Sequence, residues 1–216
     1  MAANNNAGSV ARRGRPVGDR EAKRAELLKA AVSVIAREGF AGASLRKVAQ
    51  RAGCTTGAVT YYFANKEAMV IAVAESLFDQ FDVLLGKGQH RIDVRVGLQR
   101  WLDWINSSDP EPWQAAFQLL AHARHEPAFA TLYRRRYARY RDALTAILAR
   151  GQERGVIRRD IPADLLADQL SAMGDGWMLM FPVEPNRFQP ARVQALLDAT
   201  ISMISPPQEA NNKIRS

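Results

Sequence analysis

Apolar residues recur every three to four positions along most of the chain. The first stripe runs through Leu27, Ala31 and Ile35 and ends at Gly39, and this spacing predicts an amphipathic helix that begins at Asp19. No alternation of apolar and polar residues long enough for a strand is found. The 216 residues therefore predict an all-α protein of about nine helices, large enough to bury a core.

Later stripes predict the other helices and their ends. A long helix starts near Lys66 and stops near Gly86, and Pro127 stands where a first helical turn tolerates proline. The last two helices are expected at about 163–181 and 187–205. Each carries a continuous apolar stripe, and that of the final helix includes Leu197 and Ile201.

Residues 44–66 have the pattern of two short helices joined by a tight turn. Ser44 can cap the first helix, and one apolar stripe of that helix faces inward. Gly53 can take the left-handed conformation that ends it, and Thr55 or Thr56 can cap the second helix. This is the pattern of a helix-turn-helix reader of DNA.

The second short helix has one apolar and one polar face. Val59 and Phe63, four residues apart, are expected to pack inward. The opposite face is short, polar and nearly flat, as a major groove requires. Its members are Thr56, Gly57, Thr60 and Tyr61. Tyr62 and Lys66 at its flank are expected to hold phosphates, and the hydroxyls of Ser44 and Thr55 complete the predicted DNA-binding set. The alternative is a helical hairpin packed in a core.

The distribution of charge favours DNA over that alternative. The formal net charge is +8, and all of the excess lies in residues 1–66, which hold 12 Lys/Arg and 4 Asp/Glu, whereas residues 67–216 hold 18 of each. Such an excess is expected where phosphates are neutralised. Residues 1–18 show no apolar periodicity, and this absence predicts a disordered basic arm. Arg15 in that arm either enters a minor groove or belongs to a solubilising tail.

Several short motifs between residues 20 and 70 have the order found in a known DNA-binding domain. They are Glu38-Gly39-Phe40, Ser44-Leu45, Ala49, Ala52-Gly53, Gly57, Tyr62-Phe63 and Lys66-Glu67. In these motifs the chain resembles the TetR family of bacterial transcriptional repressors. A small hydroxyl at Thr60, followed by Tyr62-Phe63, is closer to the choline-responsive BetI-type repressors than to the commoner pattern.

The resemblance implies an architecture and partners. The expected division is a basic arm at 1–18, a helix-turn-helix domain at 19–65, a helical ligand-binding and dimerisation domain at 66–205 and a polar tail at 206–216. A homodimer would bind a double-stranded DNA operator and be released by a small-molecule effector. The last two helices would form a four-helix interface with their symmetry mates, unless their stripes only cover the monomer core.

The larger domain is rich in big aromatic side chains. The residues expected to line an effector pocket are Trp101, Trp113, Phe117, Met173, Asp175 and Trp177. Asp175 near a cluster of rings suggests an aromatic cage for an organic cation. Two alternatives remain: the rings form an ordinary core, or they form a surface for a protein partner.

Other classes of protein have little support. The chain has no G-x-S-x-G elbow, no phosphate-binding glycine loop and no H-E-x-x-H motif, so it is not expected to be an enzyme. His122 and His125 could ligate a metal together with Glu126, but a third fixed ligand is lacking, so an ordinary polar patch is expected there and neither a metal nor a cofactor. Without a spanning apolar run or a secretory signal, the sequence predicts a cytoplasmic protein with no membrane contact. The arginines at 134–141 are most simply a solvated face, and the alternative of a second DNA contact has no accompanying motif.

Overall fold

The computed structural model describes residues 17–84, 94–105, 109–123 and 125–207, and throughout these ranges the regular structure is helical. The elements are α1 (Val17–Gly42), α2 (Leu45–Arg51), α3 (Thr56–Thr60), α4 (Lys66–Leu84), α5 (Val94–Ile105), α6 (Glu111–Ala123), α7 (Pro127–Glu153), α8 (Ala163–Met180), the 3-10 helix η1 (Pro185–Phe188) and α9 (Pro190–Ile204). Nine α-helices in the described ranges confirm the all-α prediction. None of these helices is long and apolar enough to cross a membrane.

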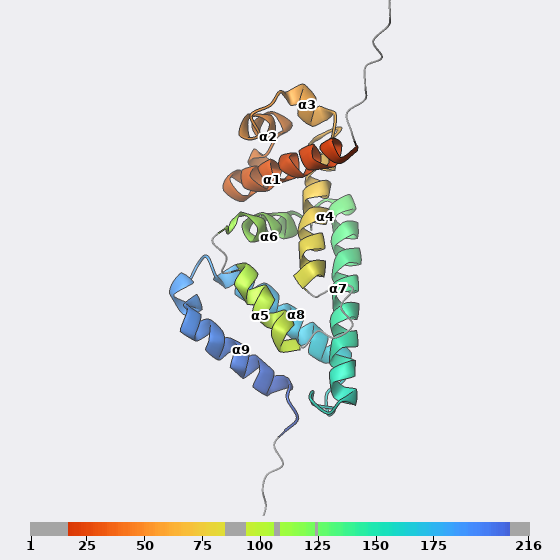
Figure 1. The fold of residues 1–216 in the computed structure, drawn as a ribbon, viewed down its shortest axis with the longest axis vertical. Coiled ribbons are helices and arrows are strands. Elements are labelled where there is room, and N and C mark those ends of the chain that lie inside the picture. Colours follow the sequence, from red (N-terminus) through yellow and green to blue (C-terminus); the bar gives the residue numbers. More distant parts are fainter. Residues whose placement is uncertain (1–16, 85–93, 106–108, 124, 208–216) are drawn as a thin grey trace, which may run out of the picture.

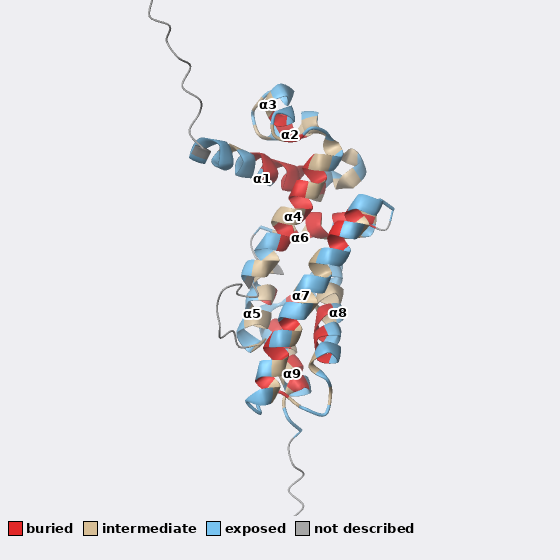
Figure 2. Cartoon of the chain, turned by 90° about the vertical axis from the view of Figure 1, so that its right-hand side faces the viewer, coloured by how far each residue is buried: buried red, intermediate tan, exposed pale blue. Residues whose placement is uncertain are grey.

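The first three helices form a unit at one end of the molecule. Figure 1 shows α2 and α3 above α1, with α4 leading down from this unit into the rest of the protein. The middle of α1, from Leu27 to Ile35, is mostly buried, whereas its beginning is exposed (Figure 2). Helix α1 begins at Val17, two residues before the expected start. At Gly39, where the helix was expected to end, the backbone has a non-helical φ of 70°.

A second contact joins this unit to the larger domain, because α6 lies beneath α1 (Figure 1). The carboxylate of Glu111, in the first turn of α6, accepts hydrogen bonds from Ser33 Oγ (3.0 Å) and Arg37 Nε (2.8 Å) of α1. Arg51 Nε of α2 donates to the same Ser33 hydroxyl at 3.0 Å. Burial opposes the charge, but the bonds from Arg37 and Ser33 hold the pKa of Glu111 below its usual value. One carboxylate therefore connects α6 to α1 directly and to α2 through Ser33.

The other end of α6 also meets α1. The imidazole of His122 is stacked on the ring of Phe40, with centroids 3.5 Å apart and planes inclined by 20°. His122 is thus half-buried in this junction and does not form a polar patch with His125, which is exposed. Two contacts, at the first and last turns of α6, fix its position along α1.

The arginine face of α7 is only partly solvated, which corrects the sequence expectation. Arg136 has 11% of its side chain exposed and donates to Asp79 of α4 at 2.6 Å. Asp82 of α4 accepts from Arg139 at 3.1 Å and lies 3.5 Å from Arg136. The expectation failed because α4 supplies acidic partners that a single-helix pattern does not reveal. These ion pairs hold α7 beside α4 (Figure 1).

The apolar stripes of the last two helices cover the monomer core, so the expectation that they form the dimer contact is wrong. Leu197 is 1% exposed and packs with Leu102, Phe188 and Val193. Ile201 lies between this cluster and the one around Leu170. The physical reason is that α5 and α7 lie against these stripes and bury them. The outer faces instead carry exposed small or apolar residues, which are Leu165, Ala172 and Leu179 of α8 and Ala195, Ala199 and Met203 of α9.

We expect Leu197→Ala to lower the free energy of unfolding by about 2–5 kcal/mol, because it leaves a cavity in a packed cluster. Val156→Ala is the control, since Val156 is 56% exposed, and it should change stability by less than about 0.5 kcal/mol. Urea unfolding followed by circular dichroism measures both. Equal effects of the two substitutions would contradict the core position of Leu197.

Candidate functional site

The helix-turn-helix is held by two side-chain caps and one glycine. Ser44 Oγ accepts from the backbone N–H of Lys47 at 3.3 Å, and Thr55 Oγ1 accepts from that of Ala58 at 3.2 Å. Gly53 has φ of 62°, the left-handed conformation expected at the end of α2. Of the two candidate caps of α3, Thr55 is the one used. The sequence alone thus dictates the local geometry of the turn.

Helix α3 presents the predicted polar face to the outside. Val59 and Phe63 are 0% and 2% exposed and anchor the helix in the core of the unit. The exposed residues are Thr56, Gly57, Thr60 and Tyr61. The Thr60 hydroxyl donates to the Gly57 carbonyl at 3.0 Å, so this side chain lies close to the helix backbone. The face lies at the end of the molecule farthest from α9 (Figure 1), where a DNA groove can approach it.

The two predicted flanking residues are more constrained than the face itself. Lys66 Nζ donates to the carbonyl of Ala41 at 3.1 Å and lies 4.4 Å from the ring centroid of Phe40. Burial, with a smaller effect from the charge of Lys47, lowers the pKa of Lys66. An ammonium has three N–H donors, so a phosphate contact of Lys66 stays a prediction. Tyr62 is half-buried beside Tyr61, with ring centroids 5.1 Å apart.

Two arginines of α1 at this surface were missed by the sequence reasoning. The guanidinium of Arg20 lies over the ring of Tyr61, 5.5 Å from its centroid, and that of Arg24 lies 5.8 Å from the centroid of Phe63. The basic residues on the polar side of α1 were the available signal, but their position beside α3 depends on the packing of the unit. Arg15, which was also predicted to contact DNA, lies outside the described residues.

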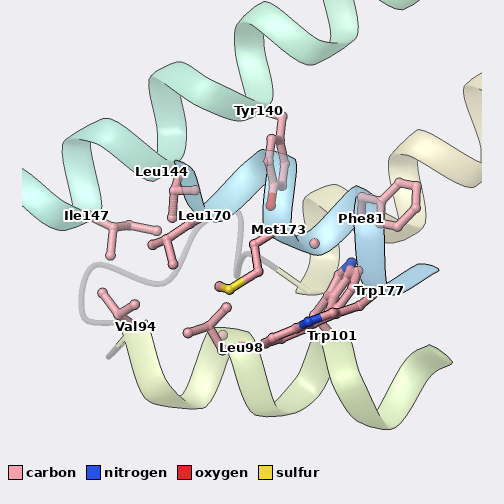
Figure 3. Close-up of a pocket in the computed structure, with 12 residues that line it drawn as sticks. Phe81, Val94, Leu98, Trp101, Tyr140, Leu144, Ile147, Leu170, Met173 and Trp177 are labelled. Carbon is pink, nitrogen blue, oxygen red and sulfur yellow. The ribbon is translucent and has the colours of Figure 1, made fainter. Parts of the chain in front are cut away.

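A separate apolar space lies in the larger domain between α4, α5, α7 and α8. Figure 3 shows Leu98 and Trp101 of α5 on one side, Tyr140 and Leu144 of α7 on the other, and Met173 between them. Counted with the solvent at its mouth, this first lobe measures about 640 Å³. Apart from the Tyr140 hydroxyl, its named side chains are almost entirely hydrocarbon, aromatic or thioether, a lining typical of small-molecule sites.

A second, more polar lobe adjoins the first. The two share Phe81, Trp101, Tyr140 and Gly174, and the second measures about 480 Å³ on the same basis. Its polar lining residues are Asp82, Arg136, Tyr137, Ser171 and Asp175. The Tyr137 hydroxyl donates to the Asp175 carboxylate at 3.1 Å. The combined space therefore has an apolar end and a polar end.

The structure brings four of the six predicted pocket residues to this space and leaves two outside it. Trp101, Met173 and Trp177 line the first lobe, and Asp175 lines the second. Trp113 and Phe117 line neither. Trp113 is 2% exposed and packs against Phe181, with centroids 5.7 Å apart, because the inner face of α6 meets α8 there. For Trp113 the core alternative was therefore the correct one.

The sequence reasoning missed several residues of the same space. Phe81 of α4 and Tyr137 and Tyr140 of α7 line it, and none of the three was among the predicted pocket residues. A stripe shows which side of a helix is apolar, but it does not show where neighbouring helices fail to fill the space between them.

An exposed, capped recognition helix on an all-helical chain defines a helix-turn-helix regulator of transcription. Comparisons with known proteins agree. Residues 27–73 match the family of bacterial regulatory proteins, tetR family, and residues 98–206 match the BetI-type transcriptional repressor, C-terminal family. The chain belongs to the TetR family and is a transcriptional repressor, not an enzyme.

Individual relatives cover most of the chain. The HTH-type transcriptional repressor SCO4008 of Streptomyces coelicolor is 31% identical over 76% of this chain and 82% of its own. The HTH-type nicotine-responsive transcriptional repressor HdnoR of Paenarthrobacter nicotinovorans is 30% identical over 76% and 86%. A solved transcriptional regulator from Rhodococcus sp. Rha1 has a TM-score of 0.70 and 26% identity over 84% and 95%.

The cap of α3 offers a test of this geometry. Thr55→Ala removes the acceptor for the Ala58 N–H and should lower the free energy of unfolding by about 0.5–2 kcal/mol. Thr56→Ala, one position later on the exposed face, should leave stability within about 0.5 kcal/mol of the wild type. Urea unfolding compares them, and a larger loss from Thr56→Ala would refute the assignment of the cap.

Proposed function

We propose that the protein binds a short palindromic operator as a homodimer and leaves it when a small molecule occupies the space between α4, α5, α7 and α8. The observation that carries the DNA part is the exposed α3 face, in the third of the chain that holds the whole net positive charge. A flat polar helix has no packing role, whereas it fits a major groove. Ligand release rests on the space in the larger domain.

The DNA-reading surface, meaning the exposed face of α3 with its flanking residues, has parts with different roles in this proposal. Thr56, Gly57, Thr60 and Tyr61 face base edges, because they are exposed on α3. Lys66 and Tyr62 contact phosphates and set the docking register. Arg20 joins them, because its position over Tyr61 places its charge at the edge of the same surface.

A homodimer follows from the length of the reading surface. One α3 covers few base pairs, and two copies must lie about 34 Å apart to reach successive major grooves. The outer faces of α8 and α9 are suited to the contact, because their exposed alanines allow close approach and Leu165, Leu179 and Met203 are 52%, 43% and 64% exposed. We therefore place the interface on these outer faces and not on the stripes that the sequence first suggested.

Effector release is supported by the position of the pocket. Phe78 and Phe81 of α4 line it, and α4 continues directly from the helix-turn-helix. A ligand can release DNA only as far as it prefers the DNA-incompetent conformation, so a tenfold loss of affinity needs about 1.4 kcal/mol of differential binding. The relative HdnoR is described as nicotine-responsive, which favours a small molecule. A protein-partner surface has less support, because Trp101, Trp113 and Trp177 are half-buried or buried.

Selection from a random DNA library with the purified chain tests the proposed function. We expect enrichment of a two-fold symmetric site whose half-sites are separated by about one or more helical turns. Binding without preference over bulk DNA would contradict it.

We expect substitutions on the reading surface to fall into two groups. Thr60→Ala and Tyr61→Ala should change the preferred bases, because these side chains face the groove. Arg20→Gln and Lys66→Gln should weaken binding to all sequences, and each should reduce the salt slope by about one. Fluorescence anisotropy at several salt concentrations separates the groups, and a uniform effect of all four would be the contrary result.

The dimer surface is tested by a charge on the outer face of α9. Ala199→Asp should give a folded monomer with much weaker operator binding, because the interface would bury an unpaired carboxylate. Ala146→Asp, on the exposed side of α7, is the matched control and should remain dimeric. Light scattering reports the mass. A dimeric Ala199→Asp variant would place the interface elsewhere.

A further inference from the structure

The second lobe of the pocket contains a carboxylate whose only hydrogen-bond partner among the described residues is a neutral phenol. Asp175 is half-buried and accepts from Tyr137, and no salt bridge joins it to a described cationic side chain. Burial raises the pKa of Asp175, and the Tyr137 hydrogen bond and the charge of Arg141 oppose part of this effect. Burial, with a contribution from Asp175, raises the pKa of Tyr140 to about 12. The phenols therefore supply no charge near neutral pH.

The arginines around this lobe have acidic partners, although Nε of Arg136 is buried without a hydrogen-bond partner among the described residues. Each of four arginines on α7 forms an ion pair with an acid on α4 or α8. The pairs are Arg135 with Glu75, Arg136 with Asp79, Arg139 with Asp82 and Arg141 with Asp168. Of the charged side chains that line the lobe, Asp82, Arg136 and Asp175, only Asp175 has no ion-pair partner among the described residues.

The walls beside Asp175 are aromatic. Phe81, Trp101, Tyr137 and Tyr140 line the same lobe. The negative ring faces of aromatic residues attract organic cations, and the attraction strengthens where water is excluded. A half-buried carboxylate within such walls favours a cation over an anion or a neutral polar group.

The two lobes meet at residues that line both, and one of them is Gly174. A Cβ placed at Gly174 would lie 3.5 Å from Cζ2 of Trp101. A methyl group would fit there in van der Waals contact, whereas a longer side chain would fill space where the lobes meet. The apolar lobe is lined by Leu98, Leu144, Ile147 and Leu170, a lining that suits a hydrocarbon chain or ring.

We infer that the effector is an amphiphilic organic cation, with its charged nitrogen at Asp175 and its apolar body in the lobe around Leu144. This inference rests on the proposed effector function and names the class of ligand. A site for fatty acids or other anionic amphiphiles is disfavoured, because each described arginine of the lobe already has an acidic partner.

The test uses four probes with the same eight-carbon chain: octylammonium, octyltrimethylammonium, octanol and octanoate. Quenching of tryptophan fluorescence reports binding, because Trp101 and Trp177 line the space. At least one cation should bind about tenfold more tightly than octanol or octanoate, equivalent to about 1.4 kcal/mol. The two cations distinguish a hydrogen-bonding ammonium from a quaternary one. Equal or tighter binding of octanoate or octanol, or no binding of either cation, would overturn the inference.

Two pairs of variants test the role of the Asp175 charge and of the place where the two lobes meet. Asp175→Asn keeps an acceptor for Tyr137 but should weaken the cation about tenfold and leave octanol unchanged. Asp164→Asn, an exposed acid on the same helix, should have no effect. Gly174→Leu should weaken every probe that binds, whereas Gly176→Leu should not, since a Cβ at Gly176 meets nothing within 4 Å. Unchanged cation binding by Asp175→Asn would also overturn the inference.

Operator DNA separates this inference from the function on which it rests. If octylammonium shows the expected selectivity but leaves operator affinity unchanged, the cation site stands and the release function fails. If octanoate binds instead and lowers operator affinity, release stands and the cation assignment fails.

Discussion

The geometry of the protein depends on the contact between α6 and α1. The carboxylate of Glu111 accepts from Ser33 and Arg37, and Ser33 in turn accepts from Arg51 of α2. Ser33 is 3% exposed, so its hydroxyl cannot exchange these partners for water without opening the junction. Leaving a buried polar group without partners costs about 1–3 kcal/mol of folding free energy. The arrangement in which all three side chains keep their hydrogen bonds is therefore favoured. This network therefore helps to hold α3, the recognition helix, in position relative to the larger domain.

The pocket is built from elements that also meet this junction. Helix α4 lines the pocket with Phe78 and Phe81 and begins beside the recognition helix, where Lys66 is tied to Ala41. Helix α6 packs Trp113 against α8 and carries Glu111 on α1. A ligand in this space would contact α4, which also leads to the helix-turn-helix. This is the physical basis for linking the two sites in the proposed function.

The sequence predicted best those features that depend on local chemistry. The caps at Ser44 and Thr55, the left-handed Gly53 and the inward Val59 follow from neighbouring residues, and the structure has all of them. It predicted less well the features that depend on contacts between distant segments. The stripe of Leu197 was correctly apolar but was placed at a dimer contact, Trp113 was placed in the pocket, and Arg136 was placed in solvent. In each case a second helix decides whether an apolar or charged face meets core, ligand or water, and periodicity within one helix carries no information about that partner.

A double-mutant cycle on operator affinity tests most directly whether the junction positions the reading helix. Ser33→Ala, Glu111→Gln and the double variant are titrated against the selected operator, with Asp164→Asn, an exposed acid of α8, as a control for the loss of a carboxylate charge. Each single variant is predicted to weaken binding, and the double variant to weaken it less than the sum of the two free-energy changes, because the residues share a hydrogen bond. Wild-type affinity for the single variants, or fully additive losses, would contradict the account.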